Sequence, residues 1–292
     1  MQPHSPFSDL QGIIHQLPDI DHCAVKKAQT ACPSPTMQQG LTLIGLKTWL
    51  AGWQGSETPS VNEAHICVLA SCYKGEDVSS VKNFIAGASK GTAPVNRLCV
   101  DMGVGLRVLE LAPELPHACN DGWLESECMA AVAFGMEATA AGGNILGLSA
   151  IAPGGKAAAI SVIKSIYDES LGLVQPLHNV NGEVIDAISV LHMMRTNGGR
   201  EIAASIGALV AARSRRLPVL IDAWAGLAAV AVLEAVQKGA SDHVLVAAAE
   251  DDEYMLIARQ IGKVPLVGFC IDEGTGCGVA SSMALLKAAC DI

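Results

Sequence analysis

The sequence predicts an α/β fold, in which helices cover both faces of a parallel sheet. Short apolar runs alternate along the chain with longer alanine-rich stretches that have helical spacing. The short runs are apolar at successive positions, as expected for strands that are buried on both faces. Half of the 292 residues are apolar but only 4% are aromatic, so the core must consist mainly of small aliphatic side chains. Such a core suits helices packed closely on a sheet.

Six runs are predicted strands, and the stretches between them supply the helices. The strands are residues 65–70, 106–111, 144–148, 218–221, 243–247 and 265–270. The clearest helical stretches are residues 40–53, 124–142, 199–213 and 225–238. Residues 1–35 contain five prolines and predict a short helix with irregular connections.

Charge and composition exclude several classes of partner. The net charge is −10, and the densest basic group is Arg213, Arg215 and Arg216, so nucleic-acid binding is not expected. The longest candidate apolar stretch, residues 244–249, is far shorter than the roughly 18 residues of a membrane span. No membrane partner is therefore expected.

The ten cysteines are spread singly, and no signal peptide is recognised, which favours reduced thiols in the cytoplasm. Two groups of His and Cys could suggest a metal site, but neither has paired CxxC spacing. They are His65, Cys67 and Cys72, and His117, Cys119 and Cys128. We therefore expect no metal and no other cofactor.

The loops that follow the predicted strands are the places to look for a site, because parallel sheets bind ligands at the carboxyl ends of their strands. Gly154, Gly155 and Lys156 follow one strand and precede a helix, so they could hold an anion. An ordinary tight turn that begins a helix explains them equally well. The spacing is not that of a P-loop, so nucleoside triphosphate binding is not implied.

A second glycine pair precedes the helix at residues 202–213. Gly198 and Gly199 would let the backbone approach a ligand, beside Thr196 and with Arg195 or Arg200 in reach of a phosphate. The alternative is a loop with solvated arginines. Asp222 ends a predicted strand, where it could contact a ligand or cap the next helix.

The most distinctive segment is residues 270–280, CIDEGTGCGVA, near the end of the chain. Gly274, Thr275 and Gly276 follow Glu273, on a backbone flexible enough to approach a substrate. A glutamate with apolar neighbours could have a raised pKa and act as a general base. The structural alternative is a glycine-rich helix start, where acidic residues are favourable near the positive end of the helix.

Three runs of this sequence resemble the nicotinate-nucleotide:dimethylbenzimidazole phosphoribosyltransferase family. They are residues 198–213, residues 216–222 and residues 272–289, and weaker similarity covers most of the chain beyond residue 35. The Glu-Gly-Thr-Gly motif at residues 273–276 is the most specific part.

The resemblance implies a Rossmann-like three-layer fold with a small helical domain formed by the chain ends. We expect residues 1–60 to belong to the small domain, residues 61–270 to form the α/β domain, and residues 271–292 to complete the site and the small domain. It also implies a homodimer with active sites near the subunit interface.

The chemistry implied by the resemblance is a transfer of phosphoribose from nicotinate mononucleotide to a benzimidazole-type base. A nitrogen of the base attacks the anomeric carbon of ribose, nicotinate leaves, and α-ribazole 5′-phosphate forms. The general base of the family falls on Glu273. The pathway would be the synthesis of the lower ligand of cobalamin.

The sequence departs from the family pattern at four places. A glutamate of a glycine-rich family motif falls on Leu148, and a lysine falls on Thr196, with Arg195 or Lys156 as replacements. An Asp-His-Gly segment is replaced at residues 71–75, and a basic and hydroxyl-rich motif is replaced by the acidic residues 248–253.

These departures leave two further hypotheses beside the phosphoribosyltransferase. One is a homologue without catalysis that acts as a ligand-binding or regulatory subunit. The other is an enzyme with a changed substrate, since the acidic residues from Glu250 to Glu253 suggest a cationic or uncharged ligand.

Overall fold

The computed structural model describes residues 5–31, 42–117, 122–167, 185–271 and 275–292. Its centre is a five-stranded sheet, β2-β1-β3-β4-β5, in which every neighbouring pair is parallel. The strands are β1 (Ala64–Ala70), β2 (Gly105–Glu110), β3 (Ile145–Ile151), β4 (Val219–Ile221) and β5 (Val244–Val246). The predicted α/β class is confirmed.

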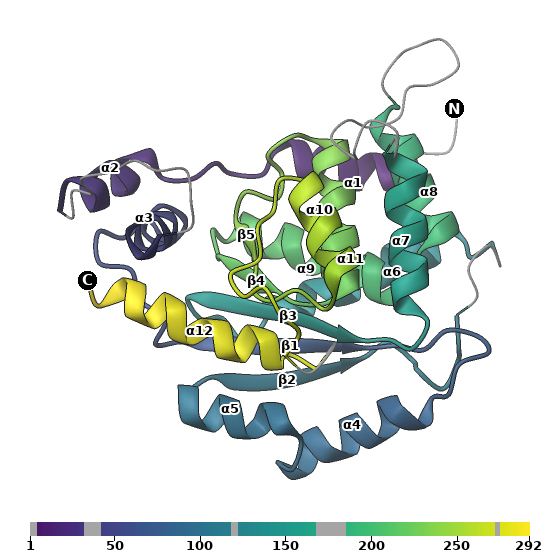
Figure 1. The fold of residues 1–292 in the computed structure, drawn as a ribbon. Helices are drawn as coiled ribbons and strands as arrows, with labels where there is room; N and C mark the ends of the chain where they lie inside the picture. The colour runs from purple at the N-terminus through teal and green to yellow at the C-terminus, as the bar shows by residue number, and fades with distance from the viewer. Residues whose placement is uncertain (1–4, 32–41, 118–121, 168–184, 272–274) are drawn as a thin grey trace.

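Helices surround this sheet and connect its strands (Figure 1). Before β1 come α1 (Pro6–His15), α2 (His22–Ala31) and α3 (Leu43–Gln54), and between β1 and β3 come α4 (Ser79–Lys90), α5 (Pro94–Met102), α6 (Glu125–Met136) and the short 3-10 helix η1 (Glu137–Thr139). Between β3 and β5 come α7 (Gly155–Ile166), α8 (Ala187–Asn197), α9 (Arg200–Ser214) and α10 (Trp224–Val236), and after β5 come α11 (Asp252–Gln260) and α12 (Cys277–Cys290).

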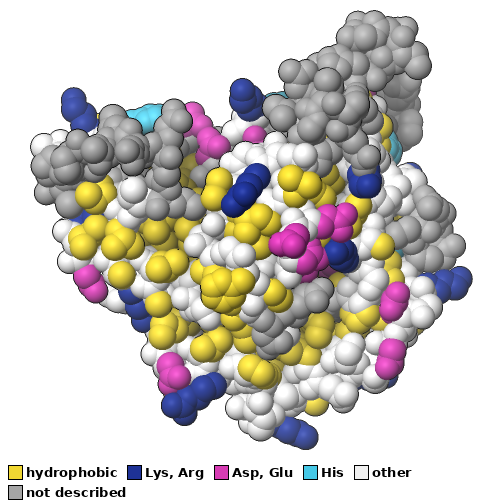
Figure 2. Space-filling model, viewed as in Figure 1, with side chains coloured by type: hydrophobic (Ala, Val, Ile, Leu, Met, Phe, Trp, Pro, Cys, Tyr) yellow, Lys and Arg dark blue, Asp and Glu magenta, His cyan; other side chains and the backbone are white. Residues whose placement is uncertain are grey.

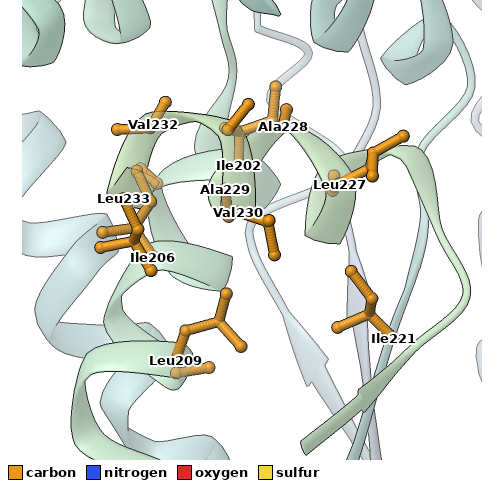
Figure 3. Packing of buried hydrophobic residues seen from close by; sticks show 14 of the residues in the cluster. Ile202, Ile206, Leu209, Ile221, Leu227, Ala228, Ala229, Val230, Val232 and Leu233 are labelled. Carbon is orange, nitrogen blue, oxygen red and sulfur yellow. The ribbon is translucent and has the colours of Figure 1, made fainter. Parts of the chain in front are cut away.

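One face of the sheet is covered by α7, α9 and α10, with α1, α6 and α8 packed behind them. Almost every residue of α9 and α10 is buried, because these helices are apolar around their whole circumference and lie between the sheet and other helices. Figure 3 shows Ile202, Ile206 and Leu209 of α9 close to the side chains of α10.

The other face is covered by α5 and α12, with α3 packed against α12. Gly147 in the middle of β3 has no side chain to separate the sheet from α12, and a Cβ there would lie 2.3 Å from Cγ1 of Val279. The C-terminal helix thus meets the pair of helices α2 and α3 here, since α3 also contacts α2. The division of the chain into two domains stays a prediction.

The predicted sixth strand at residues 265–270 is wrong. Only Val267 forms a bridge, which pairs it with Ala248 in parallel. Gly268 then follows, and Phe269 turns to solvent with 67% of its surface exposed. The pairing ends because β5 beside it is only three residues long and offers little edge to pair with.

The order of the strands determines where a ligand is expected. The chain moves outward from β1 to β2, then returns past β1 to β3 and continues to β4 and β5. The connections that follow β1 and β3 therefore run in opposite directions along the sheet. Open parallel sheets bind their ligands at the carboxyl edge beside such a reversal.

Candidate functional site

A cavity of about 230 Å³ lies at the carboxyl edge of the sheet, beyond the ends of β3 and β4. Its walls come from the loop between β3 and α7, the turn between β4 and α10, the start of α9 and the segment after β5. The glycines and the polar or aromatic residues that line it are Gly154, Gly155, Lys156, Glu201, Trp224 and Glu250. The starts of α7, α9 and α10 thus meet at one place, and their positive ends favour an anionic group.

The predicted anion loop forms one wall of this cavity. Gly154 is the N-cap of α7 and has a φ of 83°, a left-handed conformation that favours glycine. Lys156 lies in the first turn, and its Nζ donates to Oδ2 of Asp251 at 2.6 Å and contacts Oε2 of Glu253 at 3.2 Å. The hydrogen bond with Asp251 is the main reason why the pKa of Lys156 is raised. The lysine that faces the cavity is therefore already paired with two carboxylates.

Glu201, in the first turn of α9, is a lining residue that the sequence analysis missed. It is fully buried, and its two carboxyl oxygens accept hydrogen bonds from Oγ of Ser71 at 2.8 Å and from the hydroxyl of Tyr73 at 2.6 Å. Burial raises the pKa of Glu201, although both hydrogen bonds act in the opposite direction. Perturbed carboxyl groups beside a cavity are typical of functional sites.

The predicted glycine pair Gly198 and Gly199 links α8 to α9 without lining the cavity. Gly199 lies close to the side chain of Tyr73. A Cβ at Gly199 would be 2.2 Å from the hydroxyl oxygen of Tyr73. The carbonyl oxygen of Gly198 lies 3.1 Å from Nε2 of His117. In this structure, Gly199 makes room for the Tyr73 side chain that reaches Glu201.

Arg195 and Thr196, at the end of α8, do not line the cavity either. The guanidinium of Arg195 donates to the carbonyl oxygen of Trp123, and the indole nitrogen of Trp123 donates to the carbonyl oxygen of Arg195 at 2.6 Å. Thr196 is exposed. Arg200 donates to the carbonyl oxygen of Leu115 at 2.7 Å. Both arginines therefore bind backbone carbonyls in this structure.

Asp222, directly after β4, fastens α12 to the edge of the sheet. Its Oδ2 accepts the backbone N–H of Val279 at 2.9 Å, in the first turn of that helix. Its Oδ1 has no hydrogen-bond partner among the described residues. Burial raises the pKa of Asp222 to about 6. The sequence left open that Asp222 caps the next helix, which is α10. The carboxylate instead accepts a hydrogen bond from α12.

Glycine is required where α12 meets Asp222. A Cβ on Gly278 would lie 2.9 Å from both Oδ2 of Asp222 and Cβ of Ala248. Gly276 is the N-cap of the helix, with a φ of 84°, and Thr275 precedes it. The predicted general base Glu273, with Gly274, lies outside the described residues. The described part of the closing motif is thus the start of α12, next to Asp222.

The acidic residues after β5 are largely occupied by contacts within the protein. Oε1 of Glu250 accepts the backbone N–H of Trp224 at 3.2 Å, and Asp251 caps α11 by accepting the N–H of Tyr254 at 2.7 Å. Asp251 and Glu253 also pair with Lys156. Figure 2 shows acidic side chains beside a basic one on the face over α7, α10 and α11. Only Glu250 of this group lines the cavity.

Within the described ranges, no three His, Cys, Asp or Glu side chains are grouped so that they could hold a metal ion. In the same ranges, no helix has both the length and the apolar character needed to cross a membrane.

Leu148 does not lie at the cavity. It is 1% exposed in the middle of β3, between Cys67 of β1 and Ile221 of β4. It belongs to the core under α7, α9 and α10. The chain therefore has an apolar core residue where the resemblance places a glutamate of the family.

The fold and the cavity together define an α/β protein with a ligand site at the carboxyl edge of its sheet, and comparison with known proteins specifies the class. A family model described as "Phosphoribosyltransferase" matches residues 173–292. A solved nicotinate-nucleotide-dimethylbenzimidazole phosphoribosyltransferase from Thermus thermophilus has a TM-score of 0.68 at 19% identity. The match covers 99% of this chain and 95% of that one, and shows the shared fold.

Curated relatives identify the family. A nicotinate-nucleotide--dimethylbenzimidazole phosphoribosyltransferase from Rhizobium johnstonii is 32% identical, over 98% of this chain and 94% of the relative. The enzyme of that name from Agrobacterium fabrum is 31% identical, over 98% of this chain and 92% of the relative. The chain belongs to the nicotinate-nucleotide--dimethylbenzimidazole phosphoribosyltransferase family. The resemblance found from the sequence motifs is confirmed.

Proposed function

We propose that this protein transfers phosphoribose from nicotinate mononucleotide to a benzimidazole-type base, in the synthesis of the cobalamin lower ligand. The observation that carries the proposal is identity of about 30% to enzymes of this name over nearly the full length of the chain. The cavity at the carboxyl edge supports it, because its size suits part of a nucleotide and it lies where parallel sheets bind nucleotides.

In this reaction, a nitrogen of the base uses its electron pair to form a bond to the anomeric carbon of ribose. The bond from that carbon to nicotinate breaks, and its electron pair stays on the nicotinate nitrogen. The proton on the other ring nitrogen of the base passes to a general base. We assign this role to Glu273, because its motif directly precedes α12, whose start is fastened to the carboxyl edge by Asp222.

The other predicted site residues receive supporting roles in the proposal. Gly154, Gly155 and Lys156 lie at the start of α7 and would bind the phosphate, with Lys156 released from its carboxylate partners. Asp222, Gly274, Thr275 and Gly276 would place the closing motif. Gly198 and Gly199, with Arg195 and Thr196, would support the cavity from the loop between α8 and α9.

The test is incubation of the purified protein with nicotinate mononucleotide and 5,6-dimethylbenzimidazole, with nicotinate and α-ribazole 5′-phosphate measured by chromatography and mass spectrometry. Turnover by the wild type, and its loss by at least about 100-fold in Glu273→Gln, is the expected result. No product from any benzimidazole or purine would contradict the proposal.

A ligand-binding subunit without catalysis is the second candidate, and one specific observation favours it. Lys156 and Arg195, the two cations that could replace the missing lysine, are both bound to groups of the protein. Calorimetry separates the candidates. Binding of nicotinate mononucleotide that is unchanged by Glu273→Gln, without turnover in either form, would favour the binding subunit.

We further propose that the protein acts in the cytoplasm as a homodimer. Cys67, Cys72, Cys99 and Cys128 are buried free thiols, which suits a reducing compartment. Several large apolar side chains are exposed on α11 and after it, among them Leu256 and Phe269. Such side chains are typical of surfaces that contact another chain.

A further inference from the structure

The cavity has more negative than positive charge on its walls. Of the described residues that line it, Glu201 and Glu250 are acidic and Lys156 is the only cation. Lys156 is also drawn toward Asp251 and Glu253 on its outer side. The wall formed by Glu201 and Glu250 therefore favours hydroxyl groups or a positive charge over a second anion.

The two carboxyl groups differ in their surroundings. Both oxygens of Glu201 accept hydrogen bonds from Ser71 and Tyr73, and burial raises its pKa. Glu250 is partly exposed, and its Oε1 accepts the first N–H of α10, at the positive end of that helix. A negative charge is stabilised in such a position. The carboxylate of Glu250 therefore lies both at the cavity and at the positive end of a helix.

Trp224 is a cavity-lining residue that carries a buried hydrogen-bond donor, its indole N–H. The residue is 3% exposed, and its indole N–H has no acceptor among the described residues. A buried donor without a partner costs free energy unless a ligand or water supplies the acceptor. A hydroxyl group can accept from an indole N–H and donate to a carboxylate at the same time. A ribose carries two such hydroxyls side by side.

We propose that Trp224 and Glu250 bind the ribosyl group of the donor, and that Glu250 is a catalytic residue that stabilises positive charge on the ribose during transfer. This inference rests on the proposed function. If the bond to nicotinate breaks before the bond to the acceptor has fully formed, the ribose ring acquires oxocarbenium character, as in glycoside hydrolysis. A fixed carboxylate stabilises that charge more in the transition state than in the ground state.

The decisive variant is Glu250→Gln, whose amide oxygen can still accept the N–H of Trp224 but carries no charge. We expect kcat to fall by about 100-fold while KM for nicotinate mononucleotide changes by less than about threefold. The matched control is Asp252→Asn, which removes the same charge from the same acidic run. Asp252 is exposed and does not line the cavity, so kcat should stay within about twofold.

A binding measurement tests the ribose contact without turnover. Calorimetry with ribose 5-phosphate should show about tenfold weaker binding to Trp224→Phe, which keeps the ring but loses the N–H, and to Glu250→Ala. Binding to Asp252→Ala should match the wild type, because Asp252 is exposed and does not line the cavity. Circular dichroism would establish that each variant is folded.

Specific outcomes would overturn this inference. Equal losses of kcat in Glu250→Gln and Asp252→Asn would show only the effect of net charge, and unchanged kcat in Glu250→Gln would remove the catalytic role. If the wild type makes no product, the proposed function is wrong, and the binding measurement alone decides the ribose site. Absence of ribose 5-phosphate binding, or equal binding by the wild type and all variants, would overturn that site.

Discussion

Asp222 shows how one buried carboxyl group joins two distant parts of the chain. It ends β4, yet its hydrogen bond goes to Val279 of α12, 57 residues further on. The positive end of α12 offsets part of the cost of burial. Because the folded protein holds a proton on Asp222 more tightly than the unfolded chain, ionisation of this group opposes folding.

We therefore predict that the effect of Asp222→Asn on stability depends on pH. The pKa of Asp222 rises from 3.8 to about 6 on folding, so its stabilising contribution is present below pH 3.8 and is lost as the pH rises through 6. Between pH 4 and 7.5, the difference in the free energy of unfolding should move by about 2 to 3 kcal/mol in favour of Asp222→Asn. Urea titrations of both proteins measure it, and a difference independent of pH would contradict the prediction.

Gly199 and Tyr73 are predicted to be coupled. A methyl group at residue 199 would lie 2.2 Å from the hydroxyl oxygen and 2.6 Å from Cζ of Tyr73, so Gly199→Ala should destabilise the protein by about 2 kcal/mol or more. In a Tyr73→Ala background the ring is absent and, of the three nearest atoms, only Oε2 of Glu201 at 2.9 Å remains, so the same substitution should cost clearly less. The four proteins of this double-mutant cycle can be compared by urea unfolding. Additive effects would mean that the strain lies elsewhere.

Among the individual residues of the site, only some could be predicted from the sequence. The loop at Gly154 to Lys156 was predicted and lines the cavity, because a glycine pair before a helix is a local pattern. Glu201 was missed, because its partners Ser71 and Tyr73 lie about 130 residues away in the chain. The sequence around Glu201 nonetheless contained a local signal of its role. Glu201 is an acidic residue at the start of a helix whose next residues are all small or apolar until Arg213.

Among the elements, the strands were predicted well because burial on both faces leaves a local trace. Residues 65–70, 106–111 and 144–148 fall almost wholly within β1, β2 and β3. Residues 265–270 have the same apolar character but form a single bridge, because pairing depends on the length of the neighbouring strand. The sequence cannot show how far that neighbour extends.

The helix α12 allows a matched test of burial. Leu286 is fully buried in the core between α12 and the sheet, whereas its neighbour Leu285 is 37% exposed. Leu286→Ala should lower the free energy of unfolding by about 2 to 5 kcal/mol, because it leaves a cavity in a packed core. Leu285→Ala should lower it by less than about 1 kcal/mol. Equal losses in urea unfolding would mean that α12 is not docked as described.

At the scale of the whole molecule, α2, α3 and the last helix lie on the same side of the sheet, although α1 packs on the other side. The helices α2 and α3 contact each other, and α3 contacts α12 (Figure 1). The helix that follows the closing motif therefore packs against a helix that precedes β1.

The proposed homodimer gives the last prediction. Leu256, Val264 and Phe269 are 58%, 52% and 67% exposed, and they lie on α11 and on the segment that leads to the closing motif. Contact with a second copy through these side chains would remove apolar surface from water at about 25 cal/mol per Å². Sedimentation velocity should give twice the chain mass of 30.2 kDa for the wild type.

Phe269→Glu should shift this equilibrium toward the monomer, because it would bury an unpaired charge in the interface. Val100→Glu is the control, since Val100 is 74% exposed on α5, in a different part of the structure. It should sediment as the wild type does. A monomeric wild type would refute the dimer, and equal dissociation of both variants would place the interface elsewhere than at α11. If the dimer forms through Phe269, dissociation should also lower turnover, because the partner subunit would then lie close to the motif that carries Glu273.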